Sequence, residues 1–194
     1  MGRHKEFDRN EVLDKAAAMF RMKGYEATSV QDLVNCMGIN RGSLYDTFGD
    51  KQALFLASLD YYRDQHVTEL TKTLLKSSEG IGSIRQFFNL LVENRSGDRG
   101  CQGCLMVNTT VERILHDDET AAKVSAHMAI LEDAFYRALL RAQRLGEITK
   151  THQTLRSLAR YFVSSANGLC VTAKTSPDRS VLQDIADTTL SILE

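Results

Sequence analysis

The chain has 194 residues, of which 43% are hydrophobic, so it can bury a substantial core and does not have the composition of a disordered polypeptide. Its formal net charge of −1 sets it apart from strongly basic nucleic-acid-binding proteins, so any DNA binding has to rest on the geometry of a motif. A single proline, no tryptophan and no clear strand-length alternation of apolar and polar residues predict an all-α protein.

The first two helices are predicted from apolar spacing and from residues that favour helix ends. Residues 10–23 place their apolar side chains on one face, and Gly24 follows where a left-handed cap would lie. Ser29 can cap a second helix, with Asp32 three residues later, and Gly38 closes it. The apolar positions of these two helices are Val12, Leu13, Ala16, Ala17, Phe20, Val30, Leu33, Val34 and Met37.

A third, short helix is predicted directly after this glycine. Only Ile39 and Asn40 precede the segment 41–48, in which Leu44 and Phe48 lie four residues apart on one face. A short helix after a tight turn is the layout of a helix-turn-helix. Asp50 can cap a fourth helix, which the apolar pattern extends to about residue 75. We therefore predict a helix-turn-helix domain over 1–52 and a larger helical domain over 53–194.

The larger domain is predicted to contain five further amphipathic segments, separated by loops at 77–83 and 94–103. The segments are 84–93, 104–115, 120–145, 154–174 and 182–193. In the segment 104–115 we expect Val107, Val111, Ile114 and Leu115 to pack to one side. The segment 154–174 has apolar residues on more than one face, so we expect it to be largely buried.

The N-terminal fifty residues closely resemble the signature of TetR-family regulators. The residues that carry the resemblance are Gly24-Tyr25, Thr28-Ser29-Val30, Asp32-Leu33, Gly38, Gly42-Ser43-Leu44-Tyr45, Phe48 and Lys51. The resemblance implies a transcriptional repressor whose N-terminal three-helix domain binds a double-stranded DNA operator and whose helical remainder binds a small effector and forms a homodimer. Gly103–Asn108 is similar to a segment found in one branch of the family.

The predicted DNA contacts lie on the third helix and next to it. In such a motif the third helix enters the major groove with its N-terminal residues near the base edges. Arg41, Gly42, Ser43, Asp46 and Thr47 would then face DNA. The resemblance adds Tyr45 and Lys51 as phosphate contacts, with Thr28, Ser29 and Gln31 at the start of the second helix. Arg3, Lys5 and Arg9 could form a basic arm. The alternative is an ordinary solvated surface on a three-helix cluster.

The larger domain is predicted to supply the dimer interface and the effector pocket. We expect the helices at 120–145 and 154–174 to form a four-helix bundle across a two-fold axis, with Ala159, Ala166 and Gly168 allowing close approach. The alternative places the second of these helices in the core of one chain. The predicted pocket residues, any of which could instead be plain core, are Phe87, Phe88, Cys104, Val107, Asn108, Val111, Glu112, Phe135, Phe162 and Asn167.

Other chemistries are not supported by the sequence. Cys101 and Cys104 are followed by His116 and His127, but ten residues separate the histidines, too many for a zinc finger. No nucleotide, hydrolase or metalloprotease motif occurs, so we expect neither catalysis nor a cofactor. With neither a signal sequence nor a membrane span, we expect a cytoplasmic protein.

Two alternatives stay open. The chain could be a helical small-molecule or redox sensor that acts through a protein partner rather than on DNA. Within either function, Cys104 at the start of a helix could be a reactive thiol, with Cys101 as its resolving partner.

Overall fold

The computed structural model describes residues 7–75, 79–97, 102–148 and 153–193, and all the regular elements in these ranges are helices. The N-terminal part contains α1 (Arg9–Lys23), α2 (Val30–Met37) and α3 (Arg41–Phe48). They pack around a small core that includes Phe20, Leu33 and Leu44, each of which is almost fully buried. The three predicted helices and their order are confirmed.

The caps expected from the sequence are formed. The hydroxyl oxygen of Ser29 accepts a hydrogen bond from the backbone N–H of Asp32, whose carboxylate accepts one from the N–H of Ser29, so this is a complete capping box. Gly38 ends α2 in the left-handed conformation, with φ +71°. Asp50 caps the fourth helix by accepting from the N–H of Ala53 at 2.7 Å.

The fourth helix links the two parts of the molecule. α4 (Lys51–Tyr62) packs against α1 and continues through a π-helical segment, Arg63–Val67, into α5 (Thr68–Leu75). The predicted long helix to about residue 75 is therefore one helical run with a π turn inside it. The boundary that we predicted between residues 52 and 53 falls within α4, so the two parts share a continuous helix.

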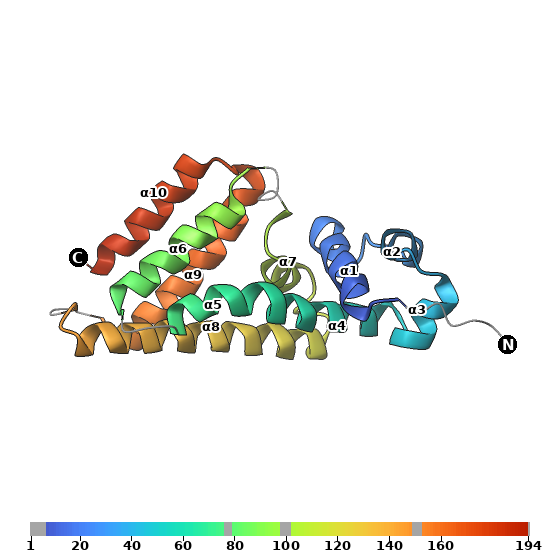
Figure 1. Cartoon of the computed structure of the whole chain (residues 1–194), viewed down its shortest axis with the longest axis horizontal. Coiled ribbons are helices and arrows are strands. Elements are labelled where there is room, and N and C mark those ends of the chain that lie inside the picture. The colour runs from blue at the N-terminus through green and yellow to red at the C-terminus, as the bar shows by residue number, and fades with distance from the viewer. Residues whose placement is uncertain (1–6, 76–78, 98–101, 149–152, 194) are drawn as a thin grey trace.

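The larger part is a bundle around an aromatic core. α5 lies beside α8 (Asp118–Arg144), and α6 (Ile81–Arg95), α9 (Leu155–Thr175) and α10 (Arg179–Leu190) lie across them (Figure 1). A final 3₁₀ turn spans Ser191–Leu193. The rings of Phe88, Phe135 and Phe162 are fully buried, with centroids 5.5–6.0 Å apart.

α7 (Leu105–Glu112) is a short helix between the larger part and α1 (Figure 1). The predicted packing of residues 104–115 on one side is wrong at its C-terminal end, because the side chains of Val111 and Leu115 are 85% and 89% exposed. The helix ends at Glu112 rather than at 115, so Leu115 does not continue its buried face, whereas Val111 lies on the exposed face of the helix itself.

No described helix is long and apolar enough to cross a membrane. Among the residues that the structure places, no group of three or more His, Cys, Asp or Glu side chains could hold a metal ion. Cys101 of the Cys-x-x-Cys segment and the basic residues Arg3 and Lys5 lie outside the described residues.

Candidate functional site

The exposed side of α3 carries most of the predicted DNA contacts. Asn40 caps this helix by accepting a hydrogen bond from the N–H of Ser43 at 2.8 Å. Leu44 and Phe48 are buried and fix the helix to the core, as expected. Their burial turns the opposite face outward, and the exposed residues there are Arg41, Gly42, Tyr45, Asp46 and Thr47, with Ser43 half-buried.

Arg41 and Tyr45 contact each other on this face. The guanidinium carbon of Arg41 lies 5.8 Å from the centre of the Tyr45 ring, and its Nη2 donates to the tyrosine hydroxyl at 3.5 Å. Two flexible side chains are thereby held one turn apart on the same surface. This geometry leaves the remaining N–H groups of Arg41 directed to solvent, where a phosphate or a guanine edge could accept from them.

The start of α2 fits the prediction only in part. Ser29 and Gln31 are exposed, but Thr28 is fully buried, and its hydroxyl donates to the backbone carbonyl of Gly24. Hydrogen bonds from the Ser29 backbone and from Lys23 lower the pKa of Asp32 to about 2. The carboxylate at the N-terminus of α2 is therefore ionised at neutral pH. Of the three contacts predicted here, Ser29 and Gln31 are accessible to DNA, whereas the buried side chain of Thr28 is not.

Lys51 lies beside the ring of Tyr25. Its Nζ is 4.1 Å from the ring centre, and the guanidinium carbon of Arg113 is 3.9 Å from the same ring. The ring also contacts Phe20 and Phe55 in the core of the N-terminal part. Tyr25 therefore contacts Lys51, which is a predicted phosphate contact, and Arg113, which follows α7. Its ring also packs on the core of the N-terminal part, which we call the DNA-binding head. Its place in the signature segment was the only sequence signal for this role.

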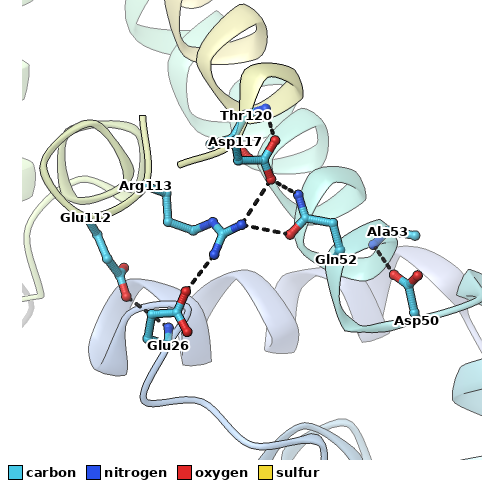
Figure 2. Close-up of polar contacts among 8 residues, drawn as sticks. All are labelled: Glu26, Asp50, Gln52, Ala53, Glu112, Arg113, Asp117 and Thr120. Carbon is cyan, nitrogen blue, oxygen red and sulfur yellow. Dashed lines mark hydrogen bonds and ion pairs between the residues drawn. The ribbon is translucent and has the colours of Figure 1, made fainter. Parts of the chain in front are cut away.

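Three residues at the end of α7 and just after it bind the N-terminal part (Figure 2). The two oxygens of Glu112 accept hydrogen bonds from the backbone N–H groups of Tyr25 and Glu26, both at 2.9 Å. Gly24 has φ +82°, a conformation that strains other residues, and a Cβ there would lie 2.8 Å from the same two oxygens and displace the Glu112 carboxylate. We name the contacts of Glu112, Arg113 and Asp117 with the N-terminal part the α7 junction.

Arg113 is the centre of the α7 junction. It binds Glu26 at 2.6 Å, Asp117 at 3.0 Å and the amide oxygen of Gln52 at 3.2 Å (Figure 2). Asp117 also accepts from Gln52 and from the N–H of Thr120. The N–H of Thr120 and the hydrogen bond from Arg113 lower the pKa of Asp117 to about 2, although burial opposes the shift. The junction thus ties the end of α7 and the start of α8 to the loop between α1 and α2 and to α4 through charged hydrogen bonds.

A cavity of about 280 Å³ lies behind α7, between α1, α4, α5, α6, α8 and α9. Its apolar wall consists of Leu70, Phe87, Leu91, Leu131 and Ala166. Its polar lining consists of Arg21, Tyr62, Asn94, Arg95, Cys104, His127, Asn167 and Cys170. The volume is near the lower end of the range for small-molecule sites, which is roughly 300 to 1,000 Å³.

Three of the predicted pocket residues, Phe87, Cys104 and Asn167, line this cavity. Phe88, Phe135 and Phe162 belong instead to the buried aromatic core. Val107, Asn108, Val111 and Glu112 border a separate hollow at the end of α1. The sequence reasoning missed Arg21, Tyr62, Arg95 and His127, since charged or polar residues of amphipathic helices are ordinarily solvated.

Cys104 is the N-cap residue of α7 and is 8% exposed. The thiol of Cys170 donates a hydrogen bond to it, which lowers the pKa of Cys104 well below its ordinary value; burial opposes this shift and the charge of Arg95 reinforces it. The two cysteines are 66 positions apart in the sequence and meet where α7 begins against α9. Such a pairing has no sequence signal.

Comparison with known proteins agrees with this geometry. Residues 12–58 match the family described as bacterial regulatory proteins, tetR family. The chain is 38% identical over 194 residues to the uncharacterized HTH-type transcriptional regulator YezE of Bacillus subtilis, with full coverage of both chains. It is 30% identical over 192 residues to the HTH-type transcriptional repressor ComR of Escherichia coli, covering 98% of this chain and 91% of ComR.

The fold is also that of solved regulators. A cysteine mutant of the TetR family regulator CifR, in complex with a 26-base-pair double-strand operator DNA, superposes with a TM-score of 0.87 at 25% identity and covers 98% of both chains. The match to the family over the helix-turn-helix, the full-length relatives and the common fold lead to one conclusion. The chain belongs to the TetR family of bacterial DNA-binding transcriptional regulators and is not an enzyme.

Proposed function

We propose that this chain is a repressor that binds a two-fold operator as a homodimer and leaves it when a small molecule enters the cavity. The relative ComR is named a repressor, and the CifR mutant was solved on operator DNA. The alternative in which the chain acts only through a protein partner loses its basis, because the chain belongs to a family of DNA-binding regulators.

In this proposal α3 enters the major groove of the operator. The N-terminal residues Arg41 and Gly42 would lie at the base edges, while Tyr45 and Lys51 contact phosphates. The exposed position of Arg41, Gly42 and Tyr45 on α3 supports this assignment. Two such helices would reach successive major grooves about 34 to 36 Å apart.

The homodimer would form through α9 and α10. Ala159 and Ala166, two of the three small residues on which we based the close approach of helices in the dimer, are buried within the chain itself, so they cannot form its interface. The other face of α9 is exposed and combines Tyr161, Ser164, Gly168 and Val171. An added Cβ on Gly168 would meet no atom within 4 Å, so a partner helix could approach closely there. Val181 on α10 and Ile192 in the following 3₁₀ turn are also exposed apolar side chains.

The observation that carries the effector mechanism is the position of α7. This helix of eight residues directly follows its N-cap Cys104, which lines the cavity, and ends at Glu112, which holds the backbone of Tyr25 and Glu26. A ligand that displaces the start of α7 would therefore shift the α7 junction and the spacing of the two DNA-binding heads. The expected coupling is about 1 to 3 kcal/mol of operator affinity.

The test is DNA binding by fluorescence anisotropy, using the region upstream of the protein's own coding sequence. The double variant Tyr45→Ala/Lys51→Ala should lose affinity at every site and show a shallower salt dependence. Lys72→Ala is the matched control, because Lys72 is an exposed α5 residue paired only with Glu69 in the described structure. Equal affinity of wild type and the double variant for the best DNA site would overturn the DNA-binding assignment.

A second candidate input is oxidation of Cys104, which the contact with Cys170 favours. Hydrogen peroxide would take two electrons from the two thiols and form a disulfide, and the two thiol protons would leave in two molecules of water. Cys101, the resolving partner that we predicted, lies outside the described residues.

The measurement compares operator binding of wild type, Cys104→Ser and Cys170→Ser before and after peroxide treatment. Cys36→Ser is the control, since Cys36 lies on α2 and its thiol donates to the backbone carbonyls of Leu33 on α2 and Lys15 on α1. If wild type and Cys104→Ser respond alike, or neither responds, Cys104 serves packing alone.

A further inference from the structure

The cavity contains a buried cation that no described carboxylate neutralises. Arg95, the last residue of α6, is 8% exposed. Its partners in the described structure are the hydroxyl of Tyr62, at 3.3 Å from its Nη2, and the thiols of Cys104 and Cys170. Its Nε has no hydrogen-bond partner there. Burying a guanidinium without a carboxylate partner costs free energy, so its position calls for a functional reason.

A second guanidinium lines the same cavity. Arg21 lies in the last turn of α1, and the Nε of this side chain is also buried without a described partner. Its Nη2 donates to the amide oxygen of Gln102. None of the described residues that line the cavity is Asp or Glu. Even with Cys104 as a thiolate, two positive charges would face one negative charge.

Two further polar side chains of the cavity, His127 and Tyr62, are uncharged at neutral pH. His127 is 4% exposed, and burial lowers its pKa, so the ring is uncharged at neutral pH. Its Nδ1 has no partner in the described structure. Burial raises the pKa of Tyr62 to about 12, so this hydroxyl keeps its proton. Both groups can form hydrogen bonds to a ligand without adding a negative charge.

The size and the apolar wall restrict the ligand further. The cavity volume of about 280 Å³ is near the lower end of the range for small-molecule sites, so the ligand is small. Phe87, Leu91 and Leu131 line the cavity and would contact an apolar body. A planar carboxylate accepts two parallel hydrogen bonds from a guanidinium fork, which matches the arginines present.

We propose that the cavity binds a small monocarboxylate with an apolar body, whose carboxylate contacts Arg95 and Arg21. The proposal names the chemical class of the effector and so rests on the proposed function for its regulatory role. Arg21 connects the cavity directly to the DNA-binding head, because it lies on α1. Its backbone carbonyl also accepts a hydrogen bond from Asn108 of α7. A carboxylate bound to Arg21 would contact the head as well as the larger part.

The test is isothermal titration calorimetry of the full chain with hexanoate and benzoate, each against its neutral amide, hexanamide or benzamide. We expect at least one acid to bind about tenfold or more tightly than its amide, because the amide lacks the charge that the guanidiniums recognise. Arg95→Gln and Arg21→Gln should each weaken the acid about tenfold and leave the amide unchanged. Arg137→Gln is the matched control, since Arg137 is an exposed α8 residue.

Arg95→Lys covers the case in which Arg95→Gln fails to fold: it keeps the charge, loses the fork and should bind the acid with intermediate affinity. Equal binding of acid and amide, no binding of either acid at millimolar concentration, or unchanged acid binding in both glutamine variants would overturn the proposal. Operator binding is measured separately. An acid that binds without releasing DNA supports the proposed ligand class and contradicts release of the operator by an effector. Release by neutral compounds alone supports effector release and contradicts the proposed ligand class.

Discussion

Arginine occupies two contrasting environments in this protein. Arg41 on α3 is exposed and stacks on Tyr45, so its charge is solvated until DNA arrives. Arg95 is buried at the end of α6 beside a hydroxyl and two thiols. An exposed cation changes the stability of the fold little, because water solvates its charge. A buried cation without a carboxylate partner lowers the stability of the fold. The difference locates the site where a ligand of opposite charge is expected.

The largest expected effect is on the stability of the ligand-free protein. Arg95→Met should raise the free energy of unfolding by about 1 to 4 kcal/mol, because it removes a buried charge at similar length, less the lost hydrogen bond to Tyr62. Arg41→Met should stay within about 0.5 kcal/mol of wild type. Urea unfolding at neutral pH measures both. A destabilised Arg95→Met would show that the buried guanidinium is satisfied without a ligand.

The next effect separates independent contacts from shared ones. Arg41→Ala and Lys51→Ala should each weaken operator binding by about 1 to 3 kcal/mol, and the losses should add because they remove different DNA contacts. In the cavity Arg21→Gln and Arg95→Gln should not add, since both contact one carboxylate. Double-mutant cycles for operator and for carboxylate binding test this contrast, which additive losses in the cavity would contradict.

The α7 junction should produce an acid-dependent loss of stability. The folded-state pKa of Asp117 is about 2, below the ordinary value of 3.8, so its carboxylate stabilises the fold above pH 4. That contribution, less than about 2 kcal/mol, is lost as the pH falls from 4 towards 2. Asp117→Asn should remove it. Because Asp32 in the head titrates in the same range, the stability difference between wild type and Asp117→Asn is the quantity to follow by thermal melting.

The smallest effect tests the direct link between α7 and the head. Glu112→Gln removes the charge that accepts the N–H groups of Tyr25 and Glu26, so their amide hydrogen exchange should accelerate about tenfold while the α8 core stays protected. Glu119→Gln is the control, as an exposed residue in the first turn of α8. Unchanged exchange at Tyr25 and Glu26 would mean that Glu112 does not hold the head.

The N-terminal part could be predicted from the sequence because its determinants are local. Ser29 and Asp32 form their capping box within four residues, and Gly38 and Asp50 set helix ends by their own conformation or side chain. Leu44 and Phe48 select the buried face of α3 by their spacing, which also fixes the exposed face. Thr28 was misplaced because its burial depends on a hydrogen bond to Gly24 that the pattern does not reveal.

The cavity was decided by tertiary packing. Apolar periodicity indicates that Phe87, Phe88, Phe135 and Phe162 are buried but not which neighbouring helix covers each ring, and among these four only Phe87 borders the cavity. Arg21 and Arg95 are 74 positions apart in the sequence, and helix-end arginines are ordinarily solvated. Only the packing of α1 and α6 around one space places both guanidiniums there, because burial is a property of the surrounding elements and not of the residue.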